Sequence, residues 1–117
     1  MVVRYPADAE SVELIDSVPG TVCLIGDPVD WFTFTIEEPA SGYGSISLAN
    51  LGDFDNDIAV YDDPGEEPLY EGNQIGSMDE HLDIDYLDHG QYYIAVEAMG
   101  YQPQGDRSFL LDLNISE

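Results

Sequence analysis

The sequence predicts an all-β fold, an antiparallel β-sandwich of about eight strands. Apolar and polar residues alternate with a period of two in most segments, as in half-buried strands. Clusters of Gly, Pro, Asn and Asp interrupt these segments at short intervals. Because one such sheet would bury only one of its faces, we expect two sheets that pack face to face.

Eight segments carry the expected strands, each bounded by a predicted turn. Segment 30–37 is the clearest, because Phe32, Phe34 and Ile36 share one face and Thr33 and Thr35 the other. Segment 77–87 is the nearest rival for a helix, but its apolar residues alternate at strand spacing. In chain order the strands are expected at 12–14, 21–25, 30–37, 45–48, 58–61, 82–86, 92–97 and 109–115, with a turn at 18–20 between the first two.

The chain is predicted to be one domain. Residues 1–10 form a loose lead-in, and residues 11–117 form the sandwich. No stretch of the sequence has the length and hydrophobicity of a membrane-spanning helix, and residues 1–10 lack the apolar region of a signal peptide.

The charge is strongly acidic, with 25 Asp and Glu against 2 Lys and Arg, for a formal net charge of −23. Such a surface repels phosphate backbones and anionic lipids, so nucleic acid and membrane are excluded as partners. The fold must tolerate strong self-repulsion, which molar salt would screen and divalent cations would neutralise. The composition, with no lysine, resembles that of proteins from salt-loving organisms. The alternative is an ordinary acidic secreted domain.

Four stretches, at 19–22, 26–35, 57–62 and 90–97, resemble in order and spacing the bacterial pre-peptidase C-terminal domains, which are related to the collagen-binding domains of clostridial collagenases. The resemblance implies a jelly-roll-like β-sandwich without catalytic residues, located extracellularly or at the cell surface. It also implies a preceding catalytic or other domain in the same polypeptide. The implied roles are secretion, stability or attachment to substrate.

A calcium site is a further expectation from this resemblance. In the collagen-binding relatives an Asp-x-x-Asp turn before an aromatic strand binds calcium together with an acidic linker. Here Asp27 and Asp30 match that turn, and Glu97 falls near a late-strand position that contributes to the same site. Carboxylate oxygens in this pattern suit Ca²⁺ or Mg²⁺ rather than Zn²⁺. Alternatively, Asp27 caps the turn and Asp30 is a solvated strand start.

A second, weaker calcium candidate is the run Asp53, Asp55 and Asp57. These residues alternate like the first ligands of an EF-hand loop. The pattern then fails, because Ile58 stands where glycine is required and Pro64 where the last glutamate should be. A looser calcium turn or a solvated acidic loop remains.

The sequence offers no catalytic constellation, so we expect a protein that is not an enzyme. Cys23 lies in an apolar run, no Gly-x-Ser-x-Gly is present, and His81 and His89 lack the spacing of zinc ligands.

Aromatic residues suggest two further functions to weigh. Several of them fall on the polar phase of strands or in loops, where they would bind a polysaccharide or a fibrous protein, or else fill the rim of the core. They are Trp31, Tyr43, Tyr61, Tyr70, Tyr93 and Tyr101. A carbohydrate-binding module is therefore one alternative function, and an assembly subunit that pairs through free strand edges is the other.

Overall fold

The computed structural model describes residues 9–23, 28–50, 56–72, 79–98 and 107–117. These residues form nine strands and no helix. The strands are β1 (Glu10–Ser11), β2 (Ile15–Val22), β3 (Val29–Ile36), β4 (Gly42–Asn50), β5 (Asn56–Tyr61), β6 (Tyr70–Gly72), β7 (Glu80–Leu87), β8 (Gly90–Ala98) and β9 (Arg107–Ser116). The all-β prediction is confirmed. Segment 77–87, for which a helix was the nearest alternative to a strand, forms strand β7 in its described part.

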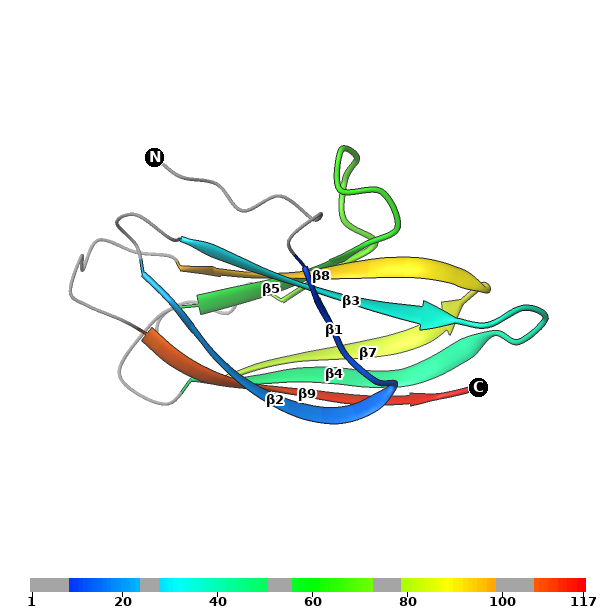
Figure 1. Cartoon of the computed structure of the whole chain (residues 1–117), viewed down its shortest axis with the longest axis horizontal. Coiled ribbons are helices and arrows are strands. Elements are labelled where there is room, and N and C mark those ends of the chain that lie inside the picture. Colours follow the sequence, from blue (N-terminus) through cyan, green and yellow to red (C-terminus); the bar gives the residue numbers. More distant parts are fainter. Residues whose placement is uncertain (1–8, 24–27, 51–55, 73–78, 99–106) are drawn as a thin grey trace.

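The strands form two stacked sheets, which Figure 1 shows as an upper and a lower layer. One sheet has the order β1-β3-β8-β5-β6 and the other β2-β9-β4-β7. Neighbouring strands pair antiparallel except β1 and β3, which pair parallel. The chain therefore passes repeatedly from one layer to the other. The two sheets are the two layers of the predicted sandwich.

The core lies between the sheets and consists of the apolar phase of each strand. Phe32 of one sheet meets Phe109 of the other edge to face, with ring centroids 6.1 Å apart. Each large side chain that is fully buried contributes about 1.5–3 kcal/mol, so this alternation holds the two layers together.

The predicted turn at 18–20 is wrong. Strand β2 runs through it, and Pro19 pairs with Leu110 while Gly20 pairs with Phe109. The strand lies at the edge of its sheet, where proline's missing N–H costs no ladder hydrogen bond. A Cβ at position 20 would collide with the Phe109 ring, so here glycine makes room for the core.

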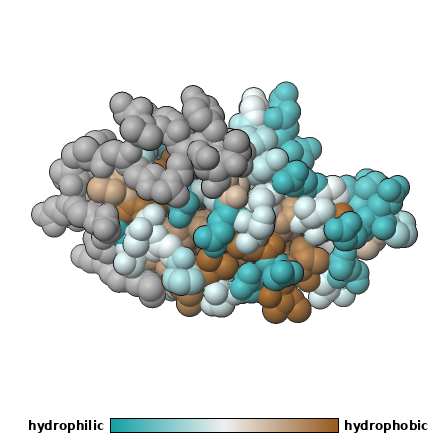
Figure 2. Space-filling view, in the orientation of Figure 1, coloured by the Kyte–Doolittle hydropathy of each residue, from teal (hydrophilic) through white to brown (hydrophobic). Residues whose placement is uncertain are grey.

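The side of the sandwich at β2 exposes apolar surface. Figure 2 shows hydrophobic atoms along the lower middle of this side, while hydrophilic atoms cover the loop between β5 and β6 and the right-hand end. Ile15 is 72% exposed here, next to a shallow hollow lined by Leu14 and Ile115. No helix in the described ranges is long and apolar enough to cross a membrane.

Candidate binding surface on the five-stranded sheet

The outer face of the five-stranded sheet carries a row of side chains across four strands. Trp31 on β3 lies opposite Ala95 on β8, Ala95 lies opposite Ala59 on β5, and Ala59 lies opposite Glu71 on β6. Directly opposed residues of an antiparallel pair direct their side chains to the same face. The two alanines therefore form a low strip between the large side chains at the ends of the row.

A cavity of about 320 Å³ lies over this strip. Ala59 and Ala95 belong to its lining, together with Pro68 and Gly72 from the segment around β6. Tyr61 contributes an aromatic wall, and three carboxyl side chains complete the lining, those of Asp57, Glu71 and Glu97. We call this feature the outer-face groove.

The Tyr61 ring, which lines the groove, contacts a second aromatic ring. The rings of Trp31 and Tyr61 lie 5.5 Å apart at an interplanar angle of 51°. Burial raises the pKa of the Tyr61 hydroxyl, and the negative charges of Glu97 and Glu71 raise that pKa further. The two glutamates are thus close enough to act on the tyrosine electrostatically, and the groove is both aromatic and anionic.

Two carboxylates of the groove face each other across strands. Asp57 on β5 lies directly opposite Glu97 on β8. Opposed residues of an antiparallel pair direct their side chains to the same face, so both carboxyl groups lie on the outer face of the sheet.

The residues of the expected calcium sites lie only partly within the described structure. Asp27, Asp53 and Asp55 lie outside the described residues. Asp30 pairs with Val96, whereas Glu97 is the next residue along β8, so the two side chains leave opposite faces of the sheet. Within the described ranges, no group of three or more His, Cys, Asp or Glu side chains could hold a metal ion.

A buried arginine lies at the start of β9, and the sequence analysis did not single it out. Arg107 is 2% exposed, and its Nη1 donates a hydrogen bond of 3.5 Å to Oδ1 of the buried Asn56. The sequence held a signal, because Arg107 shares the inward phase of Phe109 and Leu111. One of the two basic residues of the chain thus serves the interior rather than the acidic surface.

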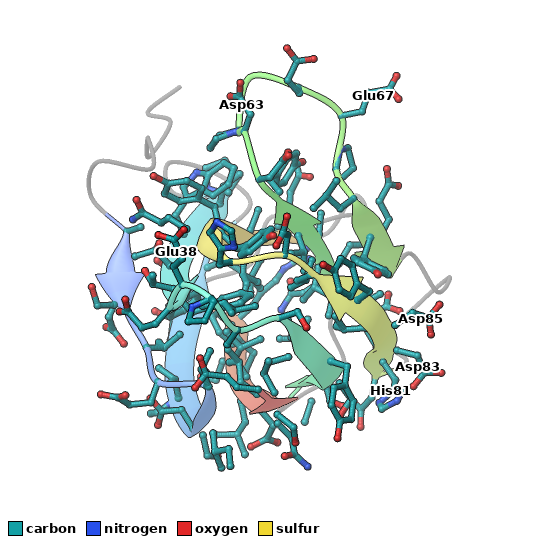
Figure 3. All side chains as sticks on the ribbon, turned by 90° about the vertical axis from the view of Figure 1, so that its right-hand side faces the viewer. Glu38, Asp63, Glu67, His81, Asp83 and Asp85 are labelled. Carbon is teal, nitrogen blue, oxygen red and sulfur yellow. The ribbon has the colours of Figure 1, made fainter. Side chains whose placement is uncertain are left out.

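Three polar side chains on the other sheet form a hydrogen-bonded chain. The Ser47 hydroxyl lies 2.8 Å from Nδ1 of His81, and Nε2 of His81 lies 2.9 Å from a carboxylate oxygen of Asp83. Figure 3 shows His81 and Asp83 at the outer edge of the molecule. Their side chains are 57% and 82% exposed, so this hydrogen-bonded chain lies at the open surface of the sheet.

The aromatic residues that the sequence singles out do not form one strip. Trp31, Tyr61 and Tyr93 share the outer face of the five-stranded sheet. Tyr43 is 59% exposed on the other sheet, Tyr70 packs against the core, and Tyr101 lies outside the described residues.

Comparison with known proteins gives a family match and structural matches. A model of the bacterial pre-peptidase C-terminal domain matches residues 28–98. The pre-peptidase C-terminal domain of a Bacillus anthracis collagenase superposes with a TM-score of 0.72 at 20% identity, over 97% of this chain and 99% of that one. PliG of Aeromonas hydrophila, a periplasmic inhibitor of g-type lysozyme, gives a TM-score of 0.47 at 16% identity, over 92% and 97% of the two chains. A search of curated protein sequences found no match.

Proposed function

Because the chain belongs to the bacterial pre-peptidase C-terminal domain family, we propose that it serves an exported peptidase-type protein as an attachment domain. Domains of this family are non-catalytic C-terminal domains of peptidases, which fits an accessory role. Their occurrence in secreted peptidases supports an extracellular or cell-surface location and a catalytic domain in the same polypeptide.

The observation that favours attachment over secretion or stability is the outer-face groove. A sandwich of this size needs only its inner faces for stability, so outer positions are ordinarily free to be small and polar. Here the outer face instead carries Tyr61 in the lining of a cavity, and the Trp31 ring packs against Tyr61. Large aromatic side chains at a concave surface give contact area at low entropic cost, which suits ligand binding.

Co-sedimentation with insoluble protein fibres or polysaccharide tests this function. We expect the domain to sediment with one of these materials and Tyr61→Ala to reduce the bound fraction about tenfold, as for an aromatic hot spot worth over 1 kcal/mol. Tyr43→Ala is the matched control, because Tyr43 is exposed on the other sheet. Equal binding by Tyr61→Ala and wild type would contradict a role of the groove. Absence of binding to every material would favour secretion or stability instead.

A carbohydrate-binding module is the second candidate function, and the paired rings of Trp31 and Tyr61 are the observation in its favour. The distinction lies in the bound material. Binding to polysaccharide but not to protein fibres, with the same loss in Tyr61→Ala, would select this candidate. A blank glycan array at low and high salt would remove it.

Calcium binding by Asp27 and Asp30, with a contribution from Glu97, is also a proposal. It is supported by the match of the Asp-x-x-Asp turn to the collagen-binding relatives, although Asp30 and Glu97 leave opposite faces of the sheet. Calorimetric titration with Ca²⁺ should give heat for the wild type and none for Asp30→Ala. Glu97→Gln then decides whether the two faces share one ion, and equal heats for all three proteins would contradict the site.

A further inference from the structure

We propose that Asn114 is a site of N-linked glycosylation when the protein is exported. Residues Asn114, Ile115 and Ser116 form an Asn-x-Ser sequence, and no other asparagine of the chain has serine or threonine two positions later. An Asn-x-Ser or Asn-x-Thr sequence whose middle residue is not proline accepts oligosaccharides in exported proteins. The inference therefore rests on the exported location given under the proposed function, and it adds a modification that does not involve the outer-face groove.

Strand β9 places both polar side chains of this acceptor sequence at the surface. Asn114 and Ser116 occupy exposed positions of the strand, whereas Ile115 between them is 2% exposed and belongs to the core. Because alternate residues of a strand face the same side, the amide and the hydroxyl both lie on the outer face of the four-stranded sheet. The position that would carry the sugar is thus open to solvent in the folded protein.

The neighbours of Asn114 on this face suit a neutral sugar. Asn114 lies opposite Ile15 on β2 and opposite Ser45 on β4. Ile15 is 72% exposed, and Tyr43, which lies opposite Ser116, is 59% exposed. Opposed residues share a face, so a sugar joined to Asn114 would lie beside these two apolar side chains and remove part of their surface from water.

The face around Asn114 carries little charge for so acidic a protein. On the paired outer positions of β2, β9 and β4, Asp112 is the one carboxylate, and the other positions carry Ser, Thr, Asn, Ala, Pro, Leu, Ile or Tyr. In contrast, most residues of the loop at 62–67 are Asp or Glu. A glycan is bulky and solubilising, so on this face it would supply the hydration that carboxylates supply elsewhere.

The attachment step is a transfer to the amide nitrogen from a lipid-linked oligosaccharide, catalysed by a transferase of the exporting cell. The Asn114 nitrogen attacks C1 of a sugar that is joined to a polyisoprenyl phosphate or pyrophosphate. The nitrogen–C1 bond forms, the bond from C1 to the phosphate oxygen breaks, and the amide loses a proton as the lipid phosphate leaves. In the folded protein β9 is paired on both sides and Ile115 is buried. The transfer therefore belongs to export, before the sheet has formed.

Mass spectrometry of the protein recovered from the culture medium of its source organism tests the site. We expect the peptide that contains Asn114 to carry a glycan, and the intact mass to fall to that of the unmodified chain when N-linked glycans are released. An unmodified Asn114 in the exported protein would overturn the proposal.

Variants expressed in the same organism test the acceptor sequence. Asn114→Gln and Ser116→Ala should each lose the glycan, whereas Ser116→Thr should keep it. Ser108→Ala is the matched control, because it removes a hydroxyl from the outer side of the same strand but outside the acceptor sequence, and it should also keep the glycan. A glycan that persists in Ser116→Ala, or one that is lost equally in Ser108→Ala, would overturn the proposal.

Failure of this inference can be told apart from failure of the proposed function, because the groove belongs to the other sheet (Figure 1). Asn114→Gln should leave co-sedimentation unchanged. If the exported protein carries no glycan while Tyr61→Ala still reduces co-sedimentation, the inference is wrong and the attachment function stands. If Asn114 is glycosylated but no insoluble material binds, the inference stands and the attachment function is wrong.

Discussion

Gly44 and Gly90 share a backbone conformation but differ in their surroundings. Their φ angles are +149° and +145°, which residues with a Cβ rarely adopt. At Gly44 an added Cβ would also collide with the carbonyl oxygen of Asn114, whereas at Gly90 nothing lies within 4 Å. Gly44 lies at a register shift between β4 and β7, and it approaches the backbone of β9 more closely than a residue with a Cβ could.

These two glycines allow conformational strain to be separated from steric overlap. We expect Gly90→Ala to cost about 1–2 kcal/mol from conformation alone. Gly44→Ala should cost about 2 kcal/mol more, because the neighbouring strand has to move. Denaturant unfolding of both variants measures the difference. Equal losses would mean that β9 accommodates the methyl group without cost.

Tyr92 links the stability of the sandwich to alkaline pH. Its ring stacks on Phe34, and its hydroxyl donates a 2.8 Å hydrogen bond to the carbonyl of Asp88. Burial raises the pKa of Tyr92 above the ordinary value of 10.0, and the charges of Asp88 and Asp62 raise that pKa further. The folded state therefore favours the protonated phenol more strongly than the unfolded state does.

The sign of the pH dependence follows from this shift. The stabilisation by Tyr92 is complete below the unfolded-state pKa near 10 and disappears as the pH rises through the higher folded-state value. We expect Tyr92→Phe to lose about 1 kcal/mol at neutral pH with the hydrogen bond. It should also show a shallower fall in stability above about pH 10 than the wild type. Urea midpoints at neutral and alkaline pH test this, and parallel pH profiles would contradict it.

At the scale of elements, the sheet edges show how pairing between molecules is avoided. The edge strands β1 and β6 have two and three residues, and β2 contains Pro19. Strand β7 is a longer edge, with eight residues, and its exposed positions carry His81, Asp83 and Asp85. Figure 3 shows these three side chains along the outer margin of the molecule. Charges on an edge disfavour pairing with another chain.

Removing the charge from β7 tests this protection and the alternative function as an assembly subunit. The triple variant His81→Thr, Asp83→Thr and Asp85→Thr keeps strand propensity and should self-associate at concentrations where the wild type is monomeric. Asp112→Thr with Asn114→Thr on the central strand β9 is a control at positions that lie away from any edge. Light scattering measures the masses. A wild type that already forms defined oligomers would instead support assembly through edges.

The strands were predictable from the sequence wherever every second residue is apolar and faces the core, as in β3, β8 and β9. Strand β6 was missed because three residues are too few to show a period. The course of β2 through Pro19 and Gly20 depends on its place at an edge and on the Phe109 ring, neither of which is local to the sequence.

The candidate site was harder to predict than the strands. Trp31, Tyr61 and Glu97 could be singled out by residue type. Tyr61 and Glu97 meet in one groove, and Trp31 contacts the Tyr61 ring, because of the register of β3, β5 and β8. Such cross-strand partners are not visible in a single sequence.

At the scale of the whole molecule, the net charge of −23 has to be balanced from solution. Arg107 is buried, and the loop between β5 and β6 adds four acidic residues at 62, 63, 66 and 67. Figure 3 shows Asp63 and Glu67 of this loop projecting away from the sheets. Folding brings these charges closer together than in the unfolded chain, so self-repulsion lowers the free energy of unfolding.

Salt should therefore stabilise the protein. The way in which the melting temperature depends on salt concentration and on the ion distinguishes screening from ion binding. The Debye length falls from about 10 Å at 0.1 M to about 3 Å at 1 M, so the melting temperature should rise over that range of NaCl and level off beyond it. Screening depends on ionic strength alone, and KCl should act as NaCl does. A bound Ca²⁺ ion would instead raise the melting temperature at millimolar concentration in a background of molar NaCl, and Asp30→Ala would remove only that increment. A melting temperature that is indifferent to NaCl would mean that the acidic groups lie too far apart to repel one another. The sequence composition would then reflect solubility rather than a fold adapted to salt.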